Sequence, residues 1–202
     1  GTSTSGLRPL AAAPHVKRYP SQAPQMSRVV VIGTSCAGKS TFARKLAHVR
    51  NVPHVELDQL FWGPDWTPKP PEQFRALVAA ATEAEQWVVD GNYSGVRDIL
   101  WSKASTVVWL NYGLPTVLWR AISRTVHRTF SQAELWHGNR ESFRRSFMSR
   151  ESILVWVVST FRRRQREFAN LRTRAAYPQL SWLEFSSPAA AARFLRGESG
   201  DG

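Results

Sequence analysis

The feature that most constrains this chain is a glycine-bounded octapeptide between an apolar run and a helical pattern. The octapeptide is Gly33-Thr34-Ser35-Cys36-Ala37-Gly38-Lys39-Ser40, which fits the phosphate-binding pattern G-x-x-x-x-G-K-[S/T]. The β-branched run 28–32 predicts a buried parallel strand, and apolar residues at 42, 46 and 49 have helical spacing. Strand, glycine loop and helix in this order can surround a polyphosphate, so the chain is predicted to bind a nucleoside triphosphate.

Each residue type in this loop has a chemical task. Backbone N–H groups of the loop would turn toward the β-phosphate, next to the positive end of the following helix. The Lys39 ammonium is expected to reach the β- and γ-phosphates, and the Ser40 hydroxyl to ligate Mg²⁺. The predicted cofactors are therefore ATP and Mg²⁺. The predicted cofactor-binding residues are Gly33, Thr34, Ser35, Cys36, Ala37, Gly38, Lys39, Ser40 and Thr41.

Short apolar segments alternate with helical patterns along the rest of the chain. The predicted strands cover 28–32, 54–58, 87–90, 106–110 and 180–185, and the predicted helices cover 41–49, 72–85, 115–130, much of 139–175 and 188–196. This alternation predicts an α/β, three-layer P-loop fold with a five-stranded parallel sheet, flanking helices and an arginine-rich helical lid. Ligands of such sheets bind at the carboxyl ends of the strands, where Gly33, Asp58 and Asp90 are expected to lie.

The ends of the chain differ in composition from its centre. Residues 1–26 contain four prolines and no acidic residue, and we expect a disordered leader or a non-native N-terminal extension there. Residues 27–196 are expected to form a single P-loop domain whose lid region covers about residues 120–175. Residues 197–202 are expected to be a frayed tail.

Composition also restricts the compartment and the partners. The single cysteine, Cys36, excludes a disulfide framework and predicts a reducing, cytoplasmic location. No segment reaches the ~18 apolar residues that a membrane-spanning helix needs, and the most apolar run, 153–158, is far too short. The formal net charge is +12, and every lysine or arginine after Lys103 is an arginine, which suits bidentate phosphate recognition.

Two carboxylates at predicted strand ends complete the candidate site. Asp90 ends the run 87–90, where an acid on a neighbouring strand would hold magnesium together with Ser40. The predicted metal residues are thus Ser40 and Asp90. Asp58 is expected to orient an acceptor hydroxyl, or to accept its proton, opposite the γ-phosphate. The alternatives are an Asp-Gly turn without a metal at Asp90 and a cap of the next segment at Asp58.

Arginines between residues 120 and 145 are candidates for the cations that phosphoryl transfer needs. Those at 120, 124 and 128 are four residues apart on a predicted helix and form one stripe. The transition state spreads negative charge over the equatorial oxygens of the migrating group, and cations stabilise that charge. Other arginines are expected to lie on solvated helix surface. The predicted catalytic residues are Lys39, Asp58, Arg124 and Arg140.

Several segments together resemble one family. The phosphate loop, Leu57-Asp58-Gln59-Leu60-Phe61-Trp62 and Trp87-Val88-Val89-Asp90-Gly91-Asn92-Tyr93 are similar to adenylate-kinase-related P-loop proteins often labelled topology modulation proteins. The resemblance covers roughly residues 27–196. It implies a nucleoside-monophosphate-kinase-like fold with an acceptor region after the second strand and an arginine-bearing lid after the fourth.

The sequence departs from true adenylate kinases at one point. Asn92-Tyr93 stands where those enzymes have Phe-Pro-Arg, so the usual arginine for the AMP phosphate is missing there, and Arg97 is the residue that could replace it. Glu56-x-Asp58 instead resembles the D-x-D of shikimate kinases, whose acceptor is a hydroxyl.

These observations predict an ATP-dependent, adenylate-kinase-like enzyme that transfers the γ-phosphate of Mg-ATP to a small-molecule acceptor, either a nucleotide or a hydroxyl compound. The expected partners are ATP and this acceptor, and the expected state is a monomer or small homo-oligomer. One alternative is a nucleotide-binding regulator with weak ATPase activity that contacts nucleic acid through its arginine face. Another is a peripheral membrane role for the basic helices around residues 153–158.

Overall fold

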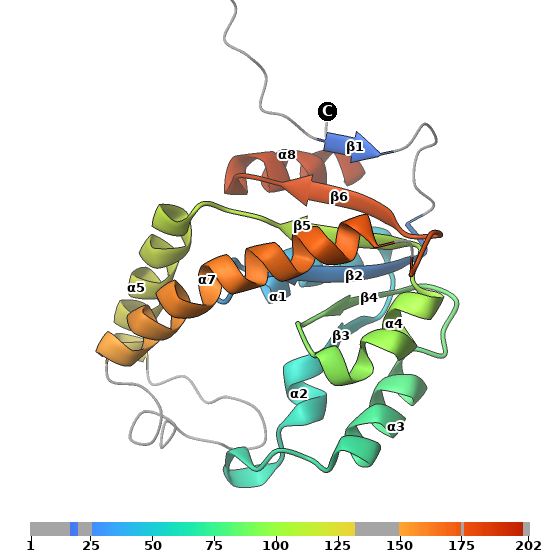
Figure 1. Cartoon of the computed structure of the whole chain (residues 1–202), viewed down its shortest axis with the longest axis horizontal. Helices are drawn as coiled ribbons and strands as arrows, with labels where there is room; N and C mark the ends of the chain where they lie inside the picture. The colour runs from blue at the N-terminus through green and yellow to red at the C-terminus, as the bar shows by residue number, and fades with distance from the viewer. Residues whose placement is uncertain (1–16, 20–25, 132–149, 175, 200–202) are drawn as a thin grey trace, which may run out of the picture.

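The computed structural model describes residues 17–19, 26–131, 150–174 and 176–199, with side chains described for 26–123, 158–174 and 176–199. These residues form three layers, with a β-sheet between two layers of helices (Figure 1). Helices alternate with parallel strands, because a parallel pair needs a crossover that passes over one face of the sheet. The predicted fold class, a three-layer α/β fold with a five-stranded parallel sheet, is confirmed.

The five parallel strands are β2 (Arg28–Gly33), β3 (His54–Glu56), β4 (Trp87–Asp90), β5 (Thr106–Leu110) and β6 (Ser181–Phe185). β2 pairs with β4 on one side and with β5 on the other, and β3 forms an edge of the described sheet. A sixth strand, β1 (Lys17–Tyr19), pairs antiparallel with β6. We did not predict β1, which lies within the segment expected to be a disordered leader.

The described α-helices are α1 (Lys39–Arg50), α2 (Leu57–Phe61), α3 (Pro71–Ala81), α4 (Arg97–Lys103), α5 (Leu114–Ser131), α7 (Arg150–Thr173) and α8 (Pro188–Glu198). Two short 3₁₀ helices are η1 (Pro64–Trp66) and η2 (Ser94–Val96). α5 and α8 agree closely with the predicted helices 115–130 and 188–196. Among the described residues, no helix combines the length and apolarity that a membrane span requires.

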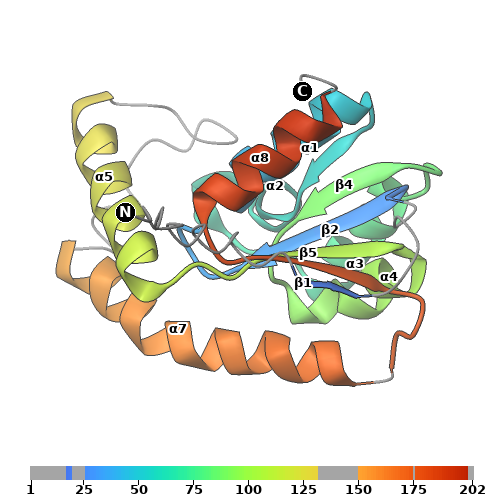
Figure 2. The same ribbon diagram turned by 90° about the horizontal axis from the view of Figure 1, so that it is seen from above.

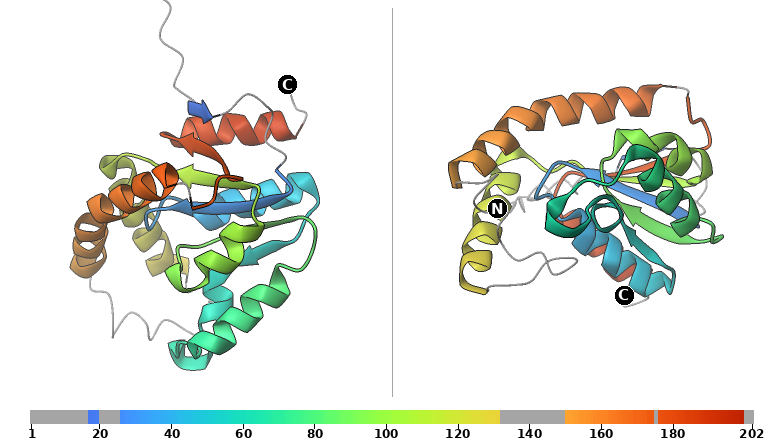
Figure 3. Two further views of the ribbon diagram at one scale, coloured as in Figure 1. Left: turned by 45° about the vertical axis from the view of Figure 1, so that its right-hand side comes forward. Right: turned by 90° about the horizontal axis from the view of Figure 1, so that it is seen from below.

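The two faces of the sheet are covered by different helices. Val29 and Val31 of β2 share a buried cluster with residues of α1 and α8, whereas Val30 and Ile32 share one with residues of α3, α4 and α7. Figures 2 and 3 show α7 on one side of the sheet and α1 with α8 on the other. Because both faces are buried, the strands are almost continuous apolar runs, which is why their positions can be read from the sequence.

The chain turns earlier after β3 than we predicted. The run 54–58 was predicted as one strand ending in Asp58, but β3 ends at Glu56 and Asp58 lies in the first turn of α2. The turn places Leu57 and Phe61, four residues apart, on one face of α2, where both pack against the same buried cluster. The prediction of Asp58 as a strand-end residue was therefore wrong, although Asp58 is still only two residues beyond the carboxyl end of β3.

α5 and α7 contact each other beside the carboxyl edge of the sheet (Figure 2). α5 follows the end of β5, and α7 runs back across one face of the sheet. Both helices belong to the region 120–175 that we predicted as a lid. Residues 132–149 of that region lie outside the described residues, and so does the side chain of every residue from 124 to 157.

Candidate functional site

The phosphate-binding loop joins β2 to α1 at the carboxyl edge of the sheet. Gly38 has φ +89°, a backbone conformation that L side chains rarely adopt, and it is the residue that directly precedes α1. The Lys39 ammonium donates a hydrogen bond to the carbonyl oxygen of Thr34, at 3.1 Å, so it folds back over the loop. The first turn of α1 contains no acidic residue, and Thr41 is exposed there. The positive end of α1 is therefore available to an anion at the loop.

The structure brings together the two residues that we predicted as metal ligands. The Ser40 hydroxyl donates a hydrogen bond to Oδ2 of Asp90, at 2.6 Å, although the residues are 50 positions apart in the chain. Asp90 ends β4 next to β2, and only 3% of it is exposed. A buried carboxylate is costly unless it is hydrogen-bonded or paired with a cation. The pair thus has the oxygen chemistry that a magnesium ion prefers.

A second buried acid lies beside this pair. Glu56 of β3 stands opposite Asp90 in the strand register, and it is 8% exposed. Burial, the charge of Asp90 and that of Asp58 raise the pKa of Glu56 above its usual value, against the opposing effect of a hydrogen bond with Ser40. Carboxylates that repel one another in this way would be stabilised by a cation.

The number of acids at this edge fits magnesium rather than an all-protein metal cage. Within the described part of the chain, no group of three or more His, Cys, Asp or Glu residues has an arrangement that holds a metal ion. Mg²⁺ usually keeps several waters and takes one or two protein carboxylates together with phosphate oxygens. The hydroxyl of Ser40 and the carboxylate of Asp90 are oxygen donors of the kind that a magnesium ion with further water or phosphate ligands would take.

Asp58 is held by an aromatic neighbour that we did not single out from the sequence. The Tyr93 hydroxyl donates to Oδ1 of Asp58 at 2.6 Å, and the Trp62 side chain also hydrogen-bonds with Tyr93. Burial and the charge of Asp58 raise the pKa of Tyr93, which keeps the phenol protonated as a donor. The ring of Tyr93 packs against the rings of Phe61 and Phe74, with centroids 4.7 and 5.2 Å away. Tyr93 therefore fixes the orientation of the Asp58 carboxylate.

One arginine of the predicted stripe contacts the phosphate loop. Arg120 of α5 donates from Nη1 to the carbonyl oxygen of Ala37 at 2.8 Å, and its guanidinium lies 5.4 Å from the ring centroid of Tyr112. We predicted Arg124 and Arg140 as the catalytic arginines, but neither side chain is among those described. The helical spacing of the three arginines gave no reason to prefer one of them as the residue at the loop. The packing of α5 is what brings Arg120 there.

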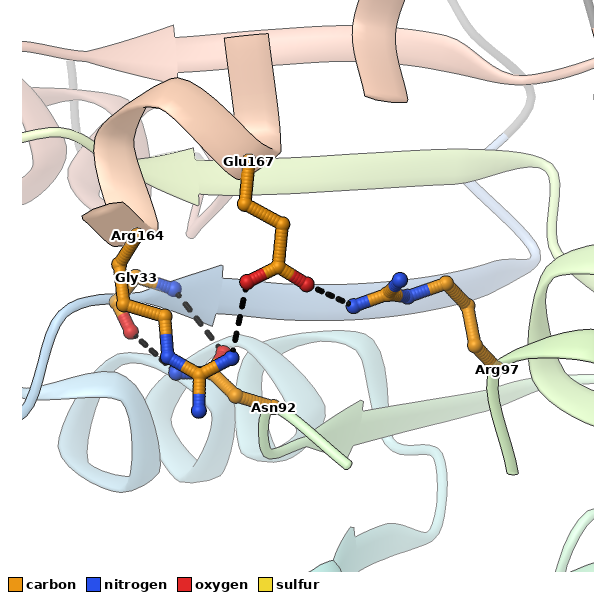
Figure 4. A network of polar contacts seen from close by, with 5 residues as sticks. All are labelled: Gly33, Asn92, Arg97, Arg164 and Glu167. Carbon is orange, nitrogen blue, oxygen red and sulfur yellow. Dashed lines mark hydrogen bonds and ion pairs between the residues drawn. The ribbon is translucent and has the colours of Figure 1, made fainter. Parts of the chain in front are cut away.

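Asn92 clamps the start of the phosphate loop (Figure 4). Its side-chain amide donates to the carbonyl oxygen of Gly33 at 2.5 Å, and its Oδ1 accepts a longer hydrogen bond, 3.4 Å, from the Gly33 N–H. Gly33 is buried and ends β2, whereas Asn92 follows β4. Asn92 occupies part of the position where true adenylate kinases have Phe-Pro-Arg. In this chain its side chain instead holds the backbone of Gly33.

An ion-pair network lies beside this clamp (Figure 4). Arg97 at the start of α4 and Arg164 of α7 both bind the Glu167 carboxylate, at 2.6 Å and 3.0 Å. Burial raises the pKa of Glu167, but the hydrogen bonds and charges of the two arginines lower it more, so the net pKa lies below its usual value. The Arg97 guanidinium also lies 5.3 Å from the ring centroid of Trp101. The network carries one more positive than negative charge.

A small pocket opens between this network and the sheet. Its lining combines residues of β2 and of the segment after β4 with residues of α4 and α7, and includes Asn92, Tyr93, Arg97, Trp101 and Phe168. Tyr93, which donates to Asp58, and Arg97 of the ion-pair network therefore line the same small pocket. The candidate site therefore has a phosphate loop, an acidic pair and a mixed aromatic and basic pocket along one sheet edge.

No family model matches the chain, and no curated protein matches it. A solved structure of shikimate kinase from Acinetobacter baumannii in complex with shikimate is similar, with a TM-score of 0.52 and 13% identity over 86% of this chain and 93% of that one. Shikimate kinase from Bacteroides thetaiotaomicron gives a TM-score of 0.49 at 15% identity, covering 84% and 96% of the two chains. A gluconokinase from Sinorhizobium meliloti 1021 gives 0.49 at 16% identity, covering 89% and 93%. At such identities the likeness to the Acinetobacter structure shows the fold alone, which is the three-layer α/β fold described above.

Proposed function

We propose that this chain is an ATP-dependent phosphotransferase that moves the γ-phosphate of Mg-ATP to a hydroxyl of a small-molecule acceptor. The observation that carries the proposal is the hydrogen bond between Ser40 and Asp90 at the base of the phosphate loop. It joins a loop suited to a polyphosphate to an acid suited to its magnesium ion. Membership among topology modulation proteins stays a prediction.

The nucleotide side of the site would act by binding and by charge. Backbone N–H groups of the loop and the Lys39 ammonium would hold the β- and γ-phosphates. Ser40 and Asp90 would hold the magnesium ion, which would supply positive charge against the negative charge that develops during transfer. Arg120, already at the loop, would add a cation there. We propose that Arg124 and Arg140 supply further cations.

The acceptor side would be organised by Asp58. Because Tyr93 holds Oδ1, the direction of the other carboxylate oxygen is set, and that oxygen could accept the proton of the acceptor hydroxyl. A general base of this kind contributes about 10²–10⁴-fold to the rate. Phe61 and Trp62 beside Tyr93 would shield the reacting groups from water, which otherwise competes as an acceptor.

The charge of the pocket narrows the class of acceptor. Arg97 and Arg164 share the single carboxylate of Glu167. Arg97 also lines a small pocket together with Tyr93, the hydrogen-bond partner of Asp58. This excess of positive charge favours an acceptor that carries a carboxylate or phosphate in addition to its hydroxyl. We therefore propose acidic hydroxyl compounds, such as sugar acids, ahead of neutral polyols.

A panel of acceptors tests this function. Release of ADP from Mg-ATP would be measured with nucleoside monophosphates, nucleosides, hydroxy acids and neutral polyols, with Lys39→Ala as the control. Stimulation by nucleosides, hydroxy acids or neutral polyols in the wild type, absent in Lys39→Ala, supports the proposal, whereas stimulation by nucleoside monophosphates alone contradicts a hydroxyl acceptor. Slow turnover that no acceptor stimulates contradicts it.

The second candidate function is a nucleotide-binding regulator that contacts nucleic acid. The observation that favours it is the exposure of Arg162, Arg163 and Arg166 on α7. Phosphate contacts make such binding strongly dependent on salt. Binding to nucleic acid that falls steeply between 50 and roughly 200 mM salt, without any acceptor-stimulated turnover, would support this function instead.

A further inference from the structure

A histidine on the edge strand holds the same carboxylate that Ser40 holds. Nε2 of His54 lies 2.8 Å from Oδ1 of Asp90, while the Ser40 hydroxyl donates to Oδ2. The His54 side chain is 16% exposed and that of Asp90 is 3% exposed. Each oxygen of this carboxylate therefore has its own partner, one from β3 and one from α1.

The strand geometry explains how His54 reaches Asp90. His54 and Glu56 are two residues apart on β3, so their side chains point to the same face of the sheet. Glu56 stands directly opposite Asp90 in the parallel register, and His54 stands opposite Val88. The three polar side chains thus gather on one face, and His54 approaches Asp90 diagonally from two residues further back in the register.

The direction of the hydrogen bond follows from the chemistry of Asp90. An ionised carboxylate only accepts hydrogen bonds, and a carboxylate that is to ligate a metal must be ionised. Nε2 of His54 therefore carries the proton and donates it. Glu56, whose charge repels that of Asp90, lies on the same face, so a carboxylate without the His54 donor would be free to turn away from Ser40.

We propose that His54 is a positioning residue for the magnesium site. Its Nε2–H holds Oδ1 of Asp90 so that Oδ2 stays directed toward Ser40, the other residue that would hold the metal ion. The inference rests on the proposed use of Mg-nucleotide. Outer hydrogen bonds to a metal ligand typically change metal affinity by 10–100-fold when they are removed. The competing interpretation is that His54 only ties β3 to β4.

The test compares His54 variants whose hydrogen-bond donor lies at different distances from Cβ. The amide nitrogen of glutamine extends about as far from Cβ as Nε2 of histidine, whereas asparagine is one bond shorter. His54→Gln should thus keep the hydrogen bond and His54→Asn should lose it. His54→Thr leaves only a hydroxyl donor on Cβ, two bonds short of the Nε2 position, in a β-branched side chain that suits an edge strand. It replaces His54→Asn if that variant does not fold. His48→Asn, on the exposed part of α1, is the matched control.

The readout is metal-dependent nucleotide binding rather than turnover. ADP binding would be titrated calorimetrically over a range of Mg²⁺ concentrations, with an EDTA sample as the metal-free reference. Paramagnetic resonance of Mn²⁺ would report the bound metal directly. We expect His54→Asn to raise the Mg²⁺ concentration for half-maximal enhancement by about 10–100-fold. His54→Gln and His48→Asn should stay close to wild type, and binding in EDTA should be the same in all proteins.

Each other outcome overturns the inference in a recognisable way. An unchanged Mg²⁺ midpoint in His54→Asn and His54→Thr would refute the positioning role while leaving the proposed function intact. An equal loss of ADP affinity with and without Mg²⁺ would show that His54 only ties two strands together. A wild-type protein whose ADP binding ignores Mg²⁺ would overturn the proposed function itself.

Discussion

The contact between Asn92 and Gly33 provides a quantitative test of how the phosphate loop is held. Asn92→Ala removes the donor that binds the Gly33 carbonyl oxygen at 2.5 Å and the acceptor that lies 3.4 Å from its N–H. Because Gly33 is buried, the carbonyl oxygen loses a partner that water cannot easily replace. The longer contact contributes little, so the expected loss of folding free energy is about 1–2 kcal/mol.

The same loss should appear in nucleotide binding. In Asn92→Ala, ATP binding would have to order the backbone at Gly33, which Asn92 holds in the wild type. The binding free energy of ATP should therefore be weaker by about 1–2 kcal/mol, and Kd should rise about 5- to 30-fold. The melting temperature of the free protein should fall by about 2–8 °C. Thermal unfolding and calorimetric titration with Mg-ATP measure the two effects, and Asn170→Ala, exposed on α7, is the control. A lower melting temperature with an unchanged Kd for ATP would refute the reasoning.

Four further substitutions follow from the site. Lys39→Ala should lower kcat about 10²–10³-fold with little change in melting temperature, and wild-type turnover would exclude the assigned role. Asp58→Asn should lower acceptor phosphorylation about 10²–10⁴-fold but background ATP hydrolysis far less, whereas equal losses would assign Asp58 to the nucleotide side. Gly38→Ala places a side chain at φ +89°, with its new Cβ 2.5 Å from Nη1 of Arg120, and should lower the free energy of unfolding by about 1–2 kcal/mol in a melting assay. The control is Gly95→Ala, whose new Cβ meets no atom within 4 Å. Glu167→Gln should destabilise the protein by about 1–2 kcal/mol at pH 7. Because the folded-state pKa of Glu167 is lowered, this difference should shrink as the pH falls below 4.5, the ordinary pKa of a glutamate side chain. A pH-independent difference would contradict the ion-pair assignment.

The parts of the fold that could be predicted are those with a continuous apolar signature. β2 and β4 are buried on both faces, so their runs stand out between polar segments. β1 has no such signature, because it is three residues long and exists only through its pairing with β6. The end of β3 could not be predicted either, since the turn at Leu57 depends on packing of α2 against residues far away in the chain.

The candidate site shows the same division. The phosphate loop and Asp90 could be identified because a local pattern and a strand end mark them. His54, Asn92 and Tyr93 carry no local pattern, and only the parallel alignment of β3, β4 and β2 brings them to their partners. The choice of Arg120 among equally spaced arginines depends on how α5 packs beside the loop.

Transfer of a labelled γ-phosphate tests the central claim most directly. The protein would be incubated with Mg-ATP labelled at the γ-phosphate and the acceptor panel, and the products separated. The account predicts that label enters one acidic hydroxyl compound in a one-to-one ratio with ADP, and that Lys39→Ala transfers none. Label recovered only as inorganic phosphate or unchanged ATP, whatever the acceptor, would contradict the account.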